Sequence, residues 1–97
     1  MVQTVHTITV LGEEKILAIE KPLVLDRVFF SIKVILGVGT WCKTKISFDD
    51  PSFFSFYLLD GEAKYFEAKG KDIFQGNVWI YNMTESDLFY AITEILR

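Results

Sequence analysis

The two residue types that most often carry catalysis or bind metals occur once each in this chain, as His6 and Cys42. A histidine metal site or a catalytic triad needs partners at a readable spacing, and none accompanies His6. The sequence therefore predicts a structural histidine, at the surface or partly buried. Cys42 shares the apolar side of its segment with Ile46 and Phe48, which predicts a small buried hydrophobe. One cysteine allows neither an intrachain disulfide nor a thiolate cluster, and no cofactor is expected.

The carboxylates of the chain are spread among predicted turns and form no recognisable motif. They include Asp49, Asp50, Asp60, Glu62, Asp72, Glu85 and Asp87. Loop carboxylates at one end of a β-sandwich could gather a calcium ion, but the sequence has no spaced calcium-binding loop. A carboxylate pair could also hydrolyse a glycoside, which requires a cleft that so short a chain hardly provides. We therefore expect a protein that is not an enzyme and has no metal centre.

Aromatic side chains are the remaining candidates for function. Strand alternation places Trp41, Trp79 and Tyr81 on faces opposite to apolar neighbours such as Cys42 and Ile80. These rings would form an exposed platform for a sugar ring or a partner protein. Alternatively, they fill the second face of the core or an interface between subunits.

The charge balance argues against a nucleic-acid partner. Ten basic and thirteen acidic side chains give a net charge of -3, and no run of Lys or Arg could neutralise several phosphates. Lys43 and Lys45 beside Trp41 are the nearest approach to a basic cluster, and such an arrangement could stack a base. Two lysines on the solvated face of a half-buried strand are the more common arrangement.

The elements that position these residues are predicted to be strands. Alternation is clean from residue 40, where Cys42, Thr44, Ile46 and Phe48 point one way. About eight short segments with Gly, Asp or Pro between them predict one domain over residues 1–97, an all-β antiparallel β-sandwich that is jelly-roll-like. The expected strands include residues 4–11, 15–20, 27–36, 53–59 and 62–68, and two within 77–96.

Two hairpins are predicted from local turn signals. Asp60-Gly61 would join residues 53–59 to 62–68, and a polar five-residue turn would close a second hairpin within residues 77–96. The sequence Thr84-Glu85-Ser86-Asp87 also has the form of a capping box, so residues 87–96 have a helical alternative. The aromatic and β-branched composition of residues 89–93 favours the strand.

Several strands are apolar on both faces, more than one sandwich can cover. Phe29 and Ile35 oppose the other apolar side chains of their strand, and Phe54 and Phe56 stand opposite Tyr57. A sandwich covers only the inner face of each sheet, so the surplus is expected to meet other subunits. The predicted interface or ligand platform comprises Trp41, Trp79, Tyr81, Phe29, Ile35, Phe54 and Phe56. We expect a closed homo-oligomer, since open contacts would polymerise.

The predicted place of synthesis is the cytoplasm. Residues 1–4 lack the charged and apolar blocks of a signal peptide, and the apolar run over residues 28–39 is shorter than the roughly 20 residues that span a bilayer. We expect no membrane association. Asn82-Met83-Thr84 matches the glycosylation acceptor pattern, which has meaning only in a secreted chain and is expected to be coincidental.

The closing residues resemble a known group of proteins. A Trp79-Ile80-Tyr81-Asn82 turn followed by a strand ending Ile92-Thr93-Glu94-Ile95-Leu96 is similar to the carboxyl ends of small jelly-roll modules in bacteriophage virion proteins, both capsid decoration proteins and fibres. The resemblance implies a homotrimeric, non-enzymatic module that contacts other virion proteins. Its expected place of synthesis is therefore the cytoplasm of the host cell, and its expected final location is a virion. It covers about the last twenty residues, and the chain lacks the Gly-rich or repetitive shaft of fibre proteins, so a capsid decoration role is expected ahead of a fibre role. A carbohydrate-binding module that uses exposed aromatic residues is the alternative.

Overall fold

The computed structural model describes residues 2–20, 25–35, 42–49, 55–59, 62–67 and 76–97, with Asp49 described only in its backbone. All regular structure in these residues is strand. The eight strands are β1 (Val2–Val10), β2 (Lys15–Ile19), β3 (Arg27–Ile35), β4 (Lys43–Asp49), β5 (Ser55–Leu59), β6 (Ala63–Glu67), β7 (Asn77–Asn82) and β8 (Leu88–Leu96). The prediction of an all-β antiparallel sandwich of about eight strands is confirmed, and residues 88–96 form a strand and not a helix.

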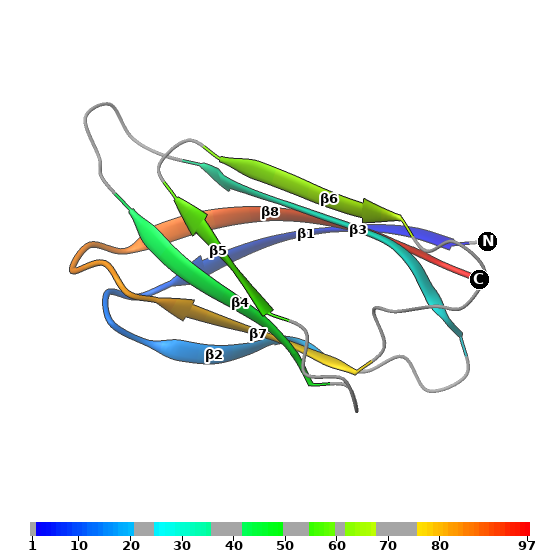
Figure 1. The fold of residues 1–97 in the computed structure, drawn as a ribbon, viewed down its shortest axis with the longest axis horizontal. Helices are drawn as coiled ribbons and strands as arrows, with labels where there is room; N and C mark the ends of the chain where they lie inside the picture. Colours follow the sequence, from blue (N-terminus) through cyan, green and yellow to red (C-terminus); the bar gives the residue numbers. More distant parts are fainter. Residues whose placement is uncertain (1, 21–24, 36–41, 50–54, 60–61, 68–75) are drawn as a thin grey trace.

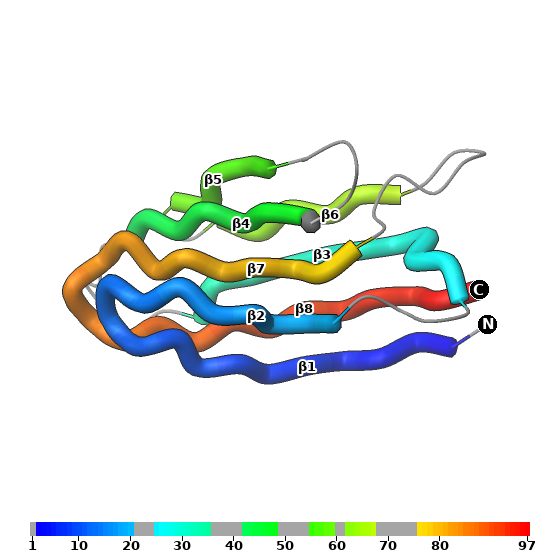
Figure 2. Tube along the Cα trace, turned by 90° about the horizontal axis from the view of Figure 1, so that it is seen from below, coloured from blue at the N-terminus to red at the C-terminus, as the bar shows by residue number. Residues whose placement is uncertain are grey.

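The strands form two four-stranded antiparallel sheets, which Figure 1 shows as two layers. One sheet has the order β1-β8-β3-β6 and the other β2-β7-β4-β5, and Figure 2 shows this second order across the molecule. In the first sheet β1 pairs with β8 and β3 with β6, and in the second sheet β2 pairs with β7 and β4 with β5. This nested pairing is the jelly-roll arrangement of two Greek keys.

The two predicted hairpins are absent. β7 and β8 belong to different sheets, and so do β5 and β6, so each connection crosses from one layer to the other. The end of β5 and the start of β6 do lie close together, because the backbone N–H of Glu62 donates to the carbonyl of Leu59 at 3.0 Å, while Asp60 and Gly61 lie outside the described residues. A turn signal reports where the chain reverses, whereas the sheet that the next strand joins is decided by which side chains must be buried.

The core lies between the sheets and follows from strand alternation. Phe30, Ile32 and Val34 of β3 and Tyr90 and Ile92 of β8 all point inward and are buried. The predicted inward set of β4 is confirmed: Cys42, Thr44, Ile46 and Phe48 are fully buried. Each inward apolar side chain of this size contributes about 1.5–3 kcal/mol relative to an exposed one, so the shared core provides the main attraction between the layers.

The two chain ends lie beside each other at one end of the sandwich (Figure 1). Val2 is opposite Leu96 in the β1–β8 ladder, and Arg97 and Asp26 exchange two backbone hydrogen bonds of 2.8 and 2.9 Å. The opposite end carries two of the crossings between the sheets, residues 11–14 and 83–87, which are bonded to each other through the N–H of Glu13 and the carbonyl of Thr84 at 2.9 Å. Function must therefore be sought in the interior, on the two outer sheet faces or at these ends.

Candidate functional site

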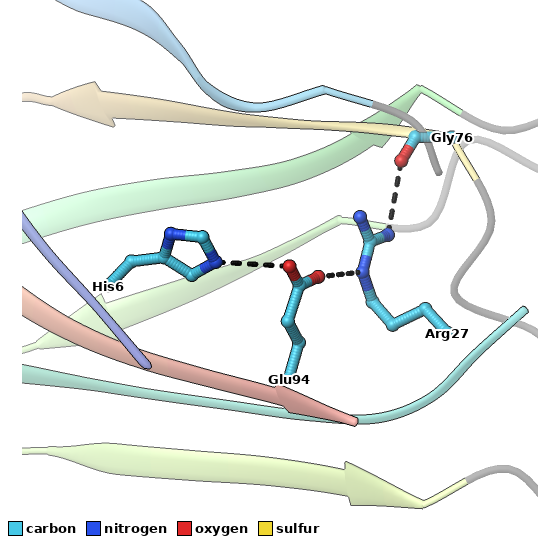
Figure 3. Close-up of polar contacts among 4 residues, drawn as sticks. All are labelled: His6, Arg27, Gly76 and Glu94. Atoms are coloured by element: carbon cyan, nitrogen blue, oxygen red, sulfur yellow. Dashed lines mark hydrogen bonds and ion pairs between the residues drawn. The ribbon is translucent and has the colours of Figure 1, made fainter. Parts of the chain in front are cut away.

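A buried ionic cluster occupies the interior near the chain ends (Figure 3). Glu94 of β8 accepts hydrogen bonds from Arg27 of β3 at 2.9 Å through one carboxylate oxygen and contacts His6 Nε2 at 3.0 Å through the other. Arg27 also donates from Nη1 to the carbonyl of Gly76 at 3.1 Å, which connects the two sheets. Arg27 is fully buried, Glu94 is 4% exposed, and the His6 side chain is 31% exposed.

This cluster is arranged as a structural connection. A histidine beside a carboxylate is also the pair that activates a nucleophile in hydrolases, but there the carboxylate serves to orient the histidine. Here the second oxygen of Glu94 is held by Arg27, and the guanidinium continues to the Gly76 carbonyl across the sandwich. Among the described residues no group of three or more His, Cys, Asp or Glu side chains could hold a metal ion. The expectation of a partly buried structural His6 fits this geometry.

Sequence reasoning missed Arg27 and Glu94, although one signal was available. Glu94 occupies an inward position in the alternation of β8, after Tyr90 and Ile92. A charged residue at a core position requires a buried partner of opposite charge. The alternation alone would therefore have indicated an internal ion pair, without identifying Arg27.

The outer face of the β1-β8-β3-β6 sheet is unusually apolar. We call it the apolar outer face; it is made by Val5, Phe29, Ile35, Tyr65, Phe89 and Ile95. Val5 is 65% exposed, Ile35 46%, Tyr65 73% and Phe89 50%. The side chains between them are small, and the charged residues among the described outward positions of this sheet are Lys33 and Glu67.

The side chains of the apolar outer face are neighbours in the ladders. Ile35 is directly opposite Phe89, and Phe29 is directly opposite Ile95. Phe29 and Tyr65 stack with ring centroids 6.5 Å apart and an interplanar angle of 20°. The outer face of an antiparallel sheet is normally polar, and exposed apolar side chains gathered on one such face mark a site of interaction.

The outer face of the β2-β7-β4-β5 sheet has a different character. Its described outward residues include three lysines and three aromatic residues, Lys15, Lys43, Lys45, Tyr57, Trp79 and Tyr81, which we call the lysine–aromatic face. The ammonium of Lys15 lies 5.4 Å from the ring centre of Trp79, and that of Lys43 lies 5.3 Å from the ring centre of Tyr57. Such cation–π contacts are worth about 0.5–1 kcal/mol at exposed sites.

The seven predicted platform residues do not form one surface. Phe29 and Ile35 belong to the apolar outer face, whereas Trp79 and Tyr81 belong to the lysine–aromatic face. Phe56 points inward, where it packs against the core and its ring centre lies 5.0 Å from that of Phe66. Its assignment to an outward platform is therefore corrected. Leu58 lies two residues after Phe56, so the two side chains share one face of β5. Leu58 is fully buried, and this face is therefore the inward one. Trp41 and Phe54 lie outside the described residues.

The glycosylation-type sequence is incompatible with modification of the folded chain. The side chain of Asn82 is buried, and its amide nitrogen donates to the carbonyls of Val10, Leu11 and Ser86 at 3.1, 3.3 and 2.8 Å. Its carbonyl oxygen accepts a bond from the N–H of Thr84 at 2.9 Å. Asn82 thus holds the two crossings together, a role that the sequence pattern did not indicate.

No family model matches the chain, and no curated protein does. Within the described residues, no helix has the length and apolar character needed to cross a membrane. Any functional assignment thus depends on the two outer faces and on the fold that carries them.

Proposed function

We propose that this protein is a non-enzymatic structural module that assembles with further copies of itself through the apolar outer face. The observation that carries the proposal is the exposure of Val5, Ile35, Tyr65 and Phe89 on the outer face of one sheet of a small sandwich. A domain of this length buries only about 60–65% of its unfolded surface, so a large apolar patch left in water is costly. Covering it in an assembly stabilises the fold.

A second copy of the chain is the occupant that suits this face. The apolar outer face carries Lys33 and Glu67, one charge of each sign among its described positions, so two such faces are complementary in charge. Burying a side chain of Val, Leu or Phe size is worth about 1.5–3 kcal/mol. Six such residues per subunit therefore reach the scale of about 4–15 kcal/mol that association costs in lost freedom.

The setting that we propose is a virion, with the module acting as a capsid decoration protein or, second, as a fibre component. The resemblance of residues 77–96 to phage jelly-roll modules supports this setting, and the jelly-roll strand order fits the fold that the resemblance implies. The same resemblance is the basis for proposing a trimer that contacts other virion proteins. The apolar outer face requires a closed assembly but is compatible with other subunit numbers.

Light scattering coupled to size exclusion tests the assembly. We expect the wild-type chain to form a homo-oligomer at micromolar concentration and Phe89→Lys to be a folded monomer by circular dichroism. The matched control is Leu59→Lys, because Leu59 is 47% exposed but lies on the other sheet. A monomeric wild type, or an equal loss of assembly in both variants, would refute the proposal.

A further inference from the structure

The lysine–aromatic face presents cations and rings in alternation. In the ladders of its sheet, Lys15 is opposite Tyr81, Tyr81 is opposite Lys45, and Lys45 is opposite Tyr57. Neighbouring strands lie about 4.8 Å apart, so the row repeats its charge about every 10 Å across the sheet. The next row contains Leu17, Trp79, Ser47 and Ser55, which adds a large ring and two hydroxyl groups.

The positive charge of this face has no acidic counterpart among its described side chains, which do not include that of Asp49 at the end of β4. The described side chains of β2, β4, β5 and β7 include no carboxylate, although the whole chain has a net charge of -3. The ammonium groups of Lys15 and Lys43 lie on aromatic rings and not against acids. Both ion pairs found among the described residues involve Glu94, in the interior. The face therefore has capacity for an external anion.

From this arrangement we infer that the lysine–aromatic face binds an anionic polysaccharide in which charged and neutral sugars alternate. The rings of Trp79, Tyr81 and Tyr57 offer stacking surfaces for sugar rings, while the lysines pair with carboxylate or sulfate groups. Charged and neutral sugars alternate along such a polymer, and lysines and aromatic rings alternate along the row. Each charged sugar can therefore pair with a lysine while the neutral sugar next to it stacks on a ring. This site is separate from the apolar outer face and does not depend on the assembly proposed above.

The spacing of the lysines favours such a glycan over single-stranded nucleic acid, which also stacks on aromatic residues. A single strand carries a phosphate on every nucleotide, whereas the proposed glycan carries a charge on every second sugar. Along a row whose lysines stand about 10 Å apart, a nucleic acid would therefore present more charges than the lysines can pair with.

Isothermal titration with hyaluronan oligosaccharides, which alternate a uronate with a neutral sugar, tests the inference on the full chain. Neutral chitin oligosaccharides and a single-stranded DNA oligomer are the comparison ligands. We expect saturable binding of hyaluronan alone, weakening as salt is raised. Lys45→Gln should weaken it about three- to fivefold, as expected for one exposed ion pair, and Lys15→Gln with Lys45→Gln about tenfold or more.

The matched control is Arg97→Gln, which removes one positive charge at an exposed position outside both outer faces and should leave hyaluronan binding unchanged. Absence of hyaluronan binding at millimolar concentration would overturn the inference. Equal effects of Arg97→Gln and Lys45→Gln, or tighter binding of the DNA or the neutral glycan, would do so as well. Light scattering of the same samples reports assembly separately, so a failure of one proposal is distinguishable from a failure of the other.

Discussion

At the scale of single residues, the molecule depends on a few polar side chains placed between apolar ones. Glu94 and Arg27 form one such connection, and the hydroxyl groups of Thr44 and Tyr90 form another at 2.6 Å. Thr44 lies on β4 and Tyr90 on β8, so their hydrogen bond joins the two sheets through the middle of the core. Buried polar groups with satisfied partners favour one arrangement of two sheets over shifted alternatives.

Replacing Glu94 by alanine should destabilise the fold strongly. The substitution leaves the buried guanidinium of Arg27 without its carboxylate, and breaking a buried pair in this way costs about 3–5 kcal/mol. Urea unfolding followed by circular dichroism measures the loss. Glu67→Ala, at an exposed position of β6, is the control and should change stability by less than about 0.5 kcal/mol. A loss below about 1 kcal/mol for Glu94→Ala would show that the pair is dispensable.

Tyr90 should make stability fall at alkaline pH. Burial raises the pKa of Tyr90 to about 12; the hydrogen bond with Thr44 opposes this shift, and nearby Cys42 adds to it. An unfolded tyrosine ionises near pH 10, so above that pH the unfolded state loses a proton that the folded state retains. The contribution of Tyr90 to the free energy of unfolding is therefore complete below about pH 10 and is lost progressively as pH rises towards about 12.

The measurement for Tyr90 is urea unfolding of the wild type and Tyr90→Phe across this pH range. At neutral pH the variant should be less stable by about 1–2 kcal/mol, because Thr44 loses its partner. The difference should shrink between about pH 10 and 12, since only the wild type carries this titration. A difference that stays constant with pH would contradict the assignment.

Residue-level prediction from the sequence succeeded where alternation was regular. The inward set of β4 and the outward Trp79 and Tyr81 followed from a period of two residues. The roles of Asn82 and Arg27 could not be predicted, because their partners lie in strands far away in the sequence. Phe56 was misplaced because the phase of a five-residue strand depends on one or two neighbours.

At the scale of elements, the two crossings between sheets support each other. Gly12 donates its N–H to the carboxylate of Asp87 at 3.0 Å, and a Cβ atom at Gly12 would lie 2.0 Å from the backbone oxygen of Glu85. Glu13 follows with a positive φ of 63°, in the left-handed region. The crossing from β1 to β2 is therefore packed directly on the backbone of the crossing from β7 to β8.

Gly12→Ala should separate these crossings. The new methyl group meets backbone that cannot rotate away, so we expect a loss of about 1–3 kcal/mol in the free energy of unfolding. Hydrogen exchange at the N–H of Glu13, which bonds to the Thr84 carbonyl, should accelerate at the same time. Ser86→Ala, at an exposed position of the facing crossing, should leave both quantities nearly unchanged. Wild-type exchange at Glu13 in Gly12→Ala would argue against a close fit.

Element boundaries were more predictable than connections. Gly, Asp and Pro identified where strands end, so strand number and sheet class followed from the sequence. The destination of each strand did not, because Asp60-Gly61 and the turn after Asn82 suit a crossing between sheets as well as a hairpin. Only the burial of both layers together decides between these outcomes.

At the scale of the whole molecule, assembly and stability should be linked. A protein that associates through the apolar outer face gains stability by mass action, so its Tm should rise with protein concentration. Calorimetry over about a hundredfold concentration range should show a rise of several degrees for the wild type. Phe89→Lys should show a Tm independent of concentration. An unchanging wild-type Tm would indicate that the face stays in water.

The nested pairing of the strands also determines when the molecule can fold. β8 lies between β1 and β3, and Val2 is opposite Leu96, so β1, which is made before the other described strands, has no described partner in its sheet until β8 has been made. Until then β1 is exposed beside other nascent chains. It is nine residues long and contains no Lys, Arg, Asp or Glu. Uncharged β-branched segments of this kind associate readily with one another. Rapid completion of each chain, or protection of β1 by a chaperone, therefore governs how much of this protein reaches its native state.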